Sequence, residues 1–290
     1  MRRLIVAALF GIVTTLPLAA ATWQQQVDAV IGWKGEDMPD GVHRFTITPE
    51  PSISIAGTPT NANLALDGYV AFRQEGGTWL MAAELAALEN HVDAVVRAAD
   101  ARGLRVTAIH NHVMHESPRV KYLHFDAVGD AVTLARDFKA AMAQTGWPVR
   151  TDDDKKDADD TSTLDVASLE STMRSTATLV DHVVEFTFDH PGSFTLEGKS
   201  FPPAMGPQSE VHFQATRGGA AIVAEFAVTA AEATTAVHYL RAHGMNIEFS
   251  ALHNHWLNES PRLFFVHVWG TGSAASLAHT MRGVLDAIGQ

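Results

Sequence analysis

The segment HNHVMHESPRVKYLHF at residues 110–125 returns 143 residues later as HNHWLNESPRLFFVHV at residues 253–268. Extended without gaps to residue 146 in the first copy and residue 289 in the second, the two copies are identical at 13 of 37 positions. Unrelated segments of this length would share about two positions. We therefore predict a chain made of two related halves.

Both copies lie in the same order of predicted elements. In the first half, apolar periodicity predicts a helix at 88–102, strands at 105–113 and 120–128, and a helix at 130–144. The second half repeats this order, with strands at 247–256 and 263–269 before a last helix at 273–288. Together with a preceding strand, the order β-α-β-β-α is most of a ferredoxin-like unit. We expect an α+β fold, a tandem duplication of this unit with extra N-terminal strands in each half.

The predicted boundaries follow from composition. The charged run TDDDKKDADDTSTLD at 151–165 is typical of an exposed linker, so the repeats are expected at 22–150 and 166–290. Residues 1–21 have the form of a signal peptide: Arg2 and Arg3 precede an apolar stretch that ends in small residues at Ala21. We therefore expect an exported protein, periplasmic or secreted, without a membrane anchor.

Overall composition excludes several classes of function. The 290 residues are 46% hydrophobic and 19% charged, which is typical of a folded protein. The absence of cysteine excludes disulfides, thiolate metal sites and cysteine nucleophiles. A formal charge of −12 argues against binding nucleic acid over a broad surface and against docking on an anionic membrane. The partner expected instead is a small molecule or another ligand of the cell envelope.

The duplicated segment carries three histidines that can share one face of a strand pair. His110 and His112 are two residues apart, so their side chains point the same way along a strand. If the chain reverses near Ser117, His110 falls opposite His124 and His112 opposite Tyr122. The second half repeats the set as His253, His255 and His267. Imidazole clusters of this kind bind zinc, iron, copper or nickel, and we expect a divalent transition metal, with zinc favoured.

Glu116 and its copy Glu259 lie in the predicted turns and are candidates for a metal ligand, a general base or an ordinary turn residue. Arg119 and Arg262 have the opposite strand parity from the histidines, which favours a salt bridge near the turn over anion binding. For the histidines themselves, the alternative to metal binding is a buried polar network that stabilises the duplicated fold.

The residues between the histidines predict the opposite, helix-covered face of each hairpin. They are apolar at alternating positions, which places the histidines on the open face. The expected apolar surfaces consist of Ile109, Val113, Leu123 and Phe125 in the first half and Leu252, Trp256, Phe264 and Val266 in the second.

The two segments AIHNHVMHESPRVKYLH at 108–124 and ALHNHWLNESPRLFFVH at 251–267 resemble the LppY/LpqO family, also called domain of unknown function 1259. Its members share the pattern ALHNHM–E–PR–(F/Y)–H, and the resemblance covers nearly the whole chain after the signal peptide. It implies a secreted protein, and it implies no particular reaction. Members named for mycobacterial lipoproteins carry a lipidated cysteine, which this sequence lacks.

These patterns lead to two hypotheses about function. The first is a metal-dependent hydrolase, with the histidines as ligands and Glu116 or Glu259 as the base. The second is a non-catalytic periplasmic protein that binds a metal or a small ligand, or whose histidines form a structural polar network.

Overall fold

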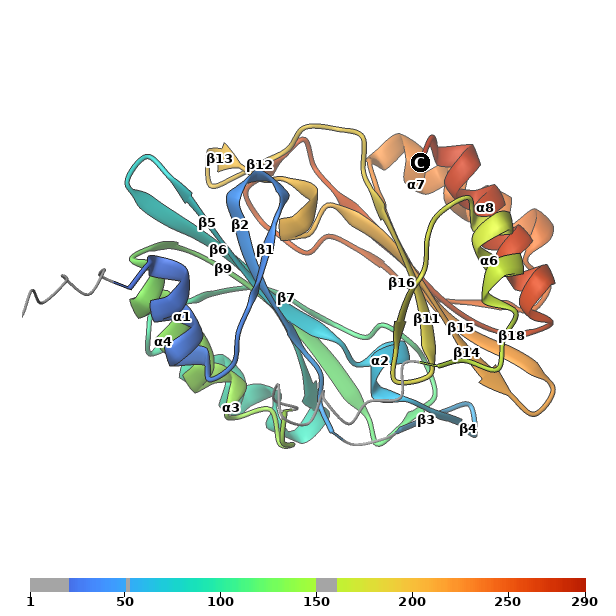
Figure 1. Ribbon diagram of the computed structural model, residues 1–290, viewed down its shortest axis with the longest axis horizontal. Coiled ribbons are helices and arrows are strands. Elements are labelled where there is room, and N and C mark those ends of the chain that lie inside the picture. Colours follow the sequence, from blue (N-terminus) through green and yellow to red (C-terminus); the bar gives the residue numbers. More distant parts are fainter. Residues whose placement is uncertain (1–20, 51–52, 150–160) are drawn as a thin grey trace, which may run out of the picture.

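The computed structural model describes residues 21–50, 53–149 and 161–290 and folds them into two similar halves (Figure 1). Within these residues, each half forms one open sheet of six strands with helices on one face. The strand orders are β1-β2-β5-β6-β9-β7 and β10-β11-β14-β15-β18-β16. The predicted α+β class and the duplication are therefore confirmed.

The first half contains a large sheet with its helices and a small three-stranded sheet. The large sheet and its helices are α1 (Trp23–Ile31), β1 (Glu36–Met38), η1 (Pro39–Gly41), β2 (Val42–Ile47), β5 (Gly68–Glu75), β6 (Thr78–Leu88), η2 (Glu89–His91), α3 (Val92–Asp100), β7 (Arg105–His110), β9 (Val120–Gly129) and α4 (Ala131–Met142). The small sheet and the short helix beside it are β3 (Ile53–Ile55), β4 (Thr58–Thr60), α2 (Ala62–Ala65) and β8 (Glu116–Ser117).

The second half repeats this plan. Its large sheet and helices are α6 (Val166–Met173), β10 (Thr178–Val180), β11 (Val183–Asp189), η3 (Pro203–Met205), β14 (Gln208–Thr216), β15 (Gly219–Val228), α7 (Ala230–His243), β16 (Ile247–His253), β18 (Phe264–Gly272) and α8 (Ala274–Ile288). Its small sheet is β12 (Thr195–Leu196), β13 (Lys199–Ser200) and β17 (Glu259–Ser260).

The central strands have the topology of a split β-α-β unit. Strand β9 lies between β6 and β7 and is antiparallel to both, so α3 connects two strands that run in the same direction. In the second half, β18 lies in the same way between β15 and β16. The predicted strands at 105–113 and 247–256 end three residues early, at His110 and His253.

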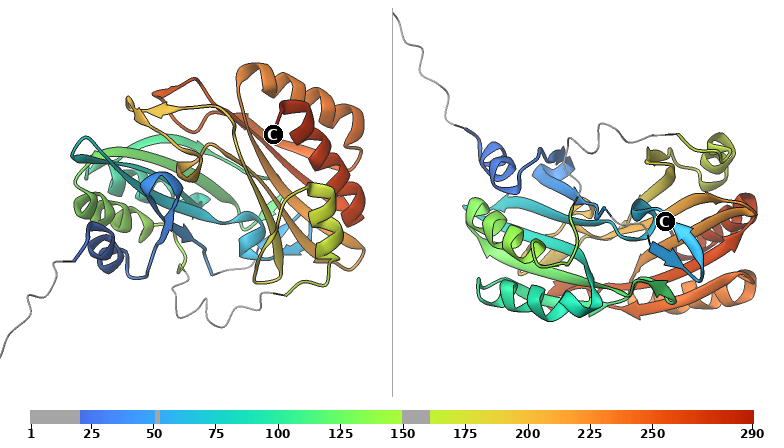
Figure 2. Two further views of the ribbon diagram at one scale, coloured as in Figure 1. Left: turned by 45° about the horizontal axis from the view of Figure 1, so that its top comes forward. Right: turned by 90° about the horizontal axis from the view of Figure 1, so that it is seen from below.

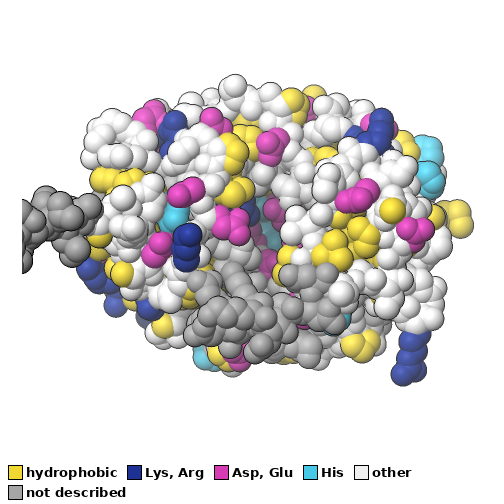
Figure 3. Space-filling view, viewed as in Figure 1, with side chains coloured by type: hydrophobic (Ala, Val, Ile, Leu, Met, Phe, Trp, Pro, Cys, Tyr) yellow, Lys and Arg dark blue, Asp and Glu magenta, His cyan; other side chains and the backbone are white. Residues whose placement is uncertain are grey.

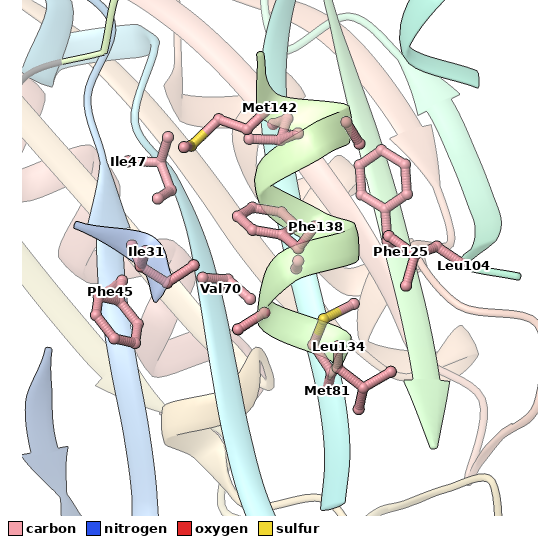
Figure 4. Packing of buried hydrophobic residues seen from close by; sticks show 14 of the residues in the cluster. Ile31, Phe45, Ile47, Val70, Met81, Leu104, Phe125, Leu134, Phe138 and Met142 are labelled. Atoms are coloured by element: carbon pink, nitrogen blue, oxygen red, sulfur yellow. The ribbon is translucent and has the colours of Figure 1, made fainter. Parts of the chain in front are cut away.

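A helix-facing core stabilises each half. Helix α4 begins at Asp130, whose side chain accepts a hydrogen bond from the backbone N–H of Thr133. Its buried face points at the sheet, and Figure 4 shows Leu134 and Phe138 packed toward Val70. Helices α6, α7 and α8 cover the second sheet with an equivalent cluster.

The two open sheet faces pack against each other. Figures 1 and 2 show the helices of the two halves on opposite outer sides, with the sheets between them. One apolar cluster joins Tyr69 and Leu80 of the first half to Leu196 and Trp256 of the second. A second cluster joins side chains of the first half, Tyr122 among them, to β11, β15 and β18. The polar residues of this interface are therefore enclosed by both halves.

Several of the expected segments lie at or beyond the limits of the described chain. The predicted signal peptide at 1–21 lies outside it except for Ala21, and so do residues 151–160 of the predicted linker. Among the helices of residues 21–50, 53–149 and 161–290, none has the length and apolar character needed to cross a membrane.

Candidate metal centre

Six histidines meet where the open faces of the two sheets pack together. They are His110, His112 and His124 of the first half and His253, His255 and His267 of the second. The three shortest distances between histidine ring centroids all cross from one half to the other. They are 3.7 Å for His110 and His253, 3.7 Å for His124 and His255, and 4.5 Å for His112 and His267.

This arrangement differs from the predicted one in how the histidines are grouped. The sequence predicts one set of three histidines in each half, and the structure joins both sets into a single cluster. Pseudo-twofold symmetry accounts for the closest pairs, because the contact of His124 with His255 has its equivalent in that of His267 with His112. The interface between the halves therefore builds the cluster.

The strand register also differs from the prediction by two residues. His110 lies opposite Tyr122, and His124 lies opposite Ala108, because the hairpin reverses about Glu116 and not about Ser117; β7 also has a one-residue register shift at Thr107. Strand β16 has the same shift at Ser250, and His253 lies opposite Phe265. His112 and His255 follow after the ends of their strands and turn inward at the cluster.

Packing fixes the rings that follow the strands. The ring of His112 stacks on Tyr122 at a centroid distance of 3.4 Å, and His255 stacks on Phe265 at 3.6 Å. The hydroxyl of Ser250 donates a hydrogen bond to the backbone carbonyl of His112 in the other half. These contacts hold the two imidazoles in defined orientations at the interface.

Two glutamates that the sequence analysis did not predict also belong to the cluster. Glu84 on β6 lies opposite His124, and Glu225 on β15 lies opposite His267. The Oε1 atom of Glu84 is 3.0 Å from Nε2 of His112, and Oε2 of Glu225 is 3.4 Å from Nδ1 of His267. Each is the single charged residue of a strongly apolar strand sequence, TWLMAAELAAL and GAAIVAEFAV. An acid at matched positions in two buried strands is the signal that would have found them.

The cluster contains two overlapping groups whose ligand atoms are close enough to hold a metal ion. The first group is His110, His253, His255 and His267, and the second is His112, His267 and Glu225. Within each group, one ligand atom from every residue lies within 4.8 Å of the others. The larger group takes one ligand from the first half and three from the second, so an ion bound there would bridge the halves.

The histidine nitrogens of the larger group are poorly satisfied without an ion. Among the described residues, Nε2 of His253, Nε2 of His255 and both ring nitrogens of His267 are buried without a hydrogen-bond partner. Nε2 of His110 lies 2.8 Å from Nε2 of His124, and one of the two nitrogens donates. Burying polar atoms without partners costs free energy. Imidazole nitrogens at these distances from one another are suited to bind a transition metal ion, which would satisfy them.

Burial keeps these histidines neutral. It lowers the pKa of His253 to about 4, and it lowers the pKa of His110, His255 and His267 well below the usual value for histidine. Nearby imidazoles lower these pKa values further. Burial raises the pKa of Glu225 well above its usual value, and the neighbouring carboxylates Glu84 and Glu210 add to this shift. A neutral imidazole has a nitrogen lone pair with which it can bind a metal.

Glu116 and Glu259 lie in the turn strands β8 and β17. An Oε1 atom of each accepts a hydrogen bond from the backbone N–H four residues later, at 3.5 Å in the first half and 3.4 Å in the second. Neither carboxylate belongs to a metal-holding group of the described chain. A catalytic role for these two residues stays a prediction. Arg262 forms the expected salt bridge with Glu259 at 3.4 Å, whereas Arg119 lies 3.9 Å from Glu89.

The predicted helix-covered faces are correct only in part. Leu123, Phe125 and Val266 are buried under the helices, and Phe264 packs against the same layer. Ile109 and Leu252 are 48% and 55% exposed and belong to neither helix-facing core. Val113 and Trp256 lie in the clusters between the halves instead, because both come after the end of their strands.

A cavity of about 580 Å³ lies beside the cluster and between the two halves. His112, His255, Glu84 and Glu225 line its inner part. Among the described residues, seven carboxylate side chains and the single guanidinium of Arg44 line this cavity. Figure 3 shows the hollow between the halves, with acidic side chains around it and a histidine inside. Its volume is that of a small-molecule site, and its field attracts cations.

Comparison with known proteins identifies the family. No curated protein and no solved structure matches this chain. A family model with the description "Domain of Unknown Function (DUF1259)" matches twice, at residues 25–144 and 167–287. These segments lie inside the two predicted repeats, and each contains one complete set of the three histidines. The chain therefore belongs to the DUF1259 family and contains two copies of its domain.

Proposed function

We propose that this protein binds a divalent transition metal between its two halves, through His110, His253, His255 and His267. One observation carries the proposal: buried imidazole nitrogens of His253, His255 and His267 lack hydrogen-bond partners in the described structure and lie within ligand distance of His110 from the other half. Nitrogen ligands in a set of four suit tetrahedral zinc, and copper and nickel also bind imidazole. Zinc is the expected metal.

A structural polar network is the weaker explanation for the cluster. In such a network the nitrogens would donate to and accept from one another, and leaving them unpaired costs about 1–3 kcal/mol for each atom. His267 is completely buried, and both of its ring nitrogens lack a partner in the part of the chain that the structure describes. A bound ion would satisfy these atoms.

We further propose that the protein is a metal-dependent hydrolase acting on a small polar substrate. When bound, a divalent ion of this kind supplies Lewis-acid polarisation and lowers the pKa of water. The cavity beside the cluster has room for a substrate, and Arg44 and the carboxylates of its wall can orient polar or cationic groups. Glu84, at 3.0 Å from Nε2 of His112, is placed to accept a proton at the inner end of this cavity.

Non-catalytic metal binding is the second candidate function, and the number of histidines in the larger group favours it. Four imidazoles fill the positions of a tetrahedral ion and leave none open for a substrate. Under either function, we propose that the protein is exported to the periplasm or secreted, on the form of residues 1–21.

Elemental analysis of the protein purified without a polyhistidine tag tests the proposed metal site. We expect at least one equivalent of zinc or another transition metal per chain. The double variant His110→Ala, His253→Ala should lose the ion of the larger group. The matched control is His279→Ala, because His279 is exposed on α8 and belongs to neither ligand group. A metal content near zero in the wild-type protein, or one that the double variant does not lower, would exclude the site.

A further inference from the structure

The smaller ligand group has a different environment from the four-histidine group. His112 and Glu225 of the smaller group line the cavity, whereas His255 is the single member of the four-histidine group among its described lining residues. The smaller group combines two imidazoles with one carboxylate, and three protein ligands leave a coordination position open. An ion held there would face the cavity.

His267 belongs to both groups and offers two separate ligand atoms. Its side chain has no exposed surface, and neither ring nitrogen has a hydrogen-bond partner within residues 21–50, 53–149 and 161–290. Its Nδ1 lies 3.4 Å from Oε2 of Glu225. If Nδ1 serves the smaller group, Nε2 is the nitrogen that remains for the four-histidine group. If His267 made only one hydrogen bond or bound only one ion, its other ring nitrogen would remain buried and unsatisfied.

We infer that the protein holds a second divalent transition metal ion at His112, His267 and Glu225, joined to the first through the two ring nitrogens of His267. This inference rests on the proposed function, because the first ion occupies the four-histidine group. An imidazole with an ion on each nitrogen has lost its ring proton, so filling both sites releases that proton to solvent. The ion that faces the cavity is the one with an open position for a substrate.

Negatively charged residues around the cavity would stabilise two neighbouring cations. Two dications this close repel each other, and negative charge nearby must offset the repulsion. Glu84 and Glu225 lie at the cluster, and Glu210 lies further along the same wall. Because carboxylates outnumber the single guanidinium of the described lining by seven to one, the cavity is also an entry path that concentrates cations.

Copper loading of the full-length mature protein tests this inference. Metal-free protein would be titrated with Cu²⁺, freed of excess by gel filtration, and measured for total copper and for its electron paramagnetic resonance signal. We expect two equivalents of copper per chain in the wild type. Because the imidazolate couples the two ions magnetically, the integrated mononuclear signal should fall well below total copper.

Variants assign the two sites separately. Glu225→Gln should bind one equivalent with a full mononuclear signal, and so should His110→Ala, which removes a ligand of the first group only. Glu36→Gln is the matched control, since Glu36 is an exposed residue of the cavity lining that belongs to neither group, and it should keep two coupled equivalents. One equivalent with a full signal in the wild type would overturn the second site and leave the proposed function intact. Two equivalents still bound by Glu225→Gln would also overturn the second site, whereas no bound copper in the wild type would overturn both proposals.

Discussion

The hydroxyl of Ser250 is a contact on which the geometry of the cluster depends. It lies at the register shift of β16 and donates a hydrogen bond to the carbonyl of His112 in the other half. Its counterpart Thr107 lies at the shift of β7, where its hydroxyl is buried without a partner among the residues described. Two equivalent positions of the repeat therefore have different roles.

We predict that Ser250→Ala lowers the free energy of unfolding by about 1–3 kcal/mol, because it leaves the carbonyl of His112 without its donor. It should also weaken metal binding by about tenfold, the usual effect of losing a contact that orients a ligand. Chelator competition and denaturant unfolding would measure these effects. Thr107→Val is the matched control and should cost less than about 1 kcal/mol. Equal losses in both variants would show that the hydrogen bond has no special role.

The buried histidines also predict how the metal-free protein responds to acid. The pKa of His253 is about 4 in the folded protein and near 6.5 when unfolded, so between these values the unfolded chain binds more protons. The contribution of His253 to stability is therefore complete above about pH 6.5 and is lost as the pH falls toward 4. His110, His255 and His267 shift in the same direction.

We expect the thermal midpoint of the metal-free protein to decrease as the pH is lowered from 7 to 5. His253→Gln should make this decrease less steep. Scanning calorimetry in a chelator at several pH values would measure it. A midpoint that stays level over this range in the wild type would contradict the burial of neutral imidazoles.

At the scale of elements, the spacing of residues along a strand predicted the histidine cluster better than it predicted which residues pair between strands. His110 and His112 lie at the same cluster, as spacing by two predicts, although His112 follows the end of β7. The pairing of β7 with β9 nevertheless differs from the expected one by two residues, because the hairpin reverses one residue earlier than expected, and a single sequence does not fix that point. Glu84 was visible in the sequence as an acid within an apolar strand, and its pairing with His124 depended on knowing that β6 and β9 are neighbours.

The helices are held by their apolar faces, and α4 offers a direct test. Phe138 is completely buried against the first sheet (Figure 4), and Arg136 on the same helix is exposed. We predict that Phe138→Ala lowers the free energy of unfolding by about 3–5 kcal/mol. Arg136→Ala should change it by less than about 0.5 kcal/mol. Urea unfolding measures both, and similar values for the two variants would contradict the observed packing.

At the scale of the whole molecule, duplication creates a site that neither copy contains alone. The sequence shows the two histidine sets plainly, and it contains no local pattern that says which sheet faces meet. That contact is non-local: β9 and β18 lie more than 130 residues apart in the chain, yet the ring of His124 on β9 reaches His255 beside β18. The sequence predicts one set in each half, whereas five of the six predicted histidines fall in two groups that are shared between the halves and His124 falls in neither group of the described chain.

An ion that bridges the halves should stabilise both of them together. We predict that zinc raises the thermal midpoint of a single cooperative transition. When free zinc is 100 times its dissociation constant, the free energy of unfolding should rise by about 2.7 kcal/mol. A chelator should reverse the effect, and His253→Ala should abolish it while His279→Ala leaves it unchanged. Calorimetry that shows zinc shifting the transition of one half only would contradict a bridging ion.

Anomalous diffraction from crystals of the tag-free, metal-loaded protein would locate the ion directly. We predict an anomalous peak between the halves, within bonding distance of His110 on one side and of His253, His255 and His267 on the other. A peak surrounded by ligands from one half alone, such as His110, His112 and Glu116, would contradict a shared centre, and so would the absence of any peak at the six histidines.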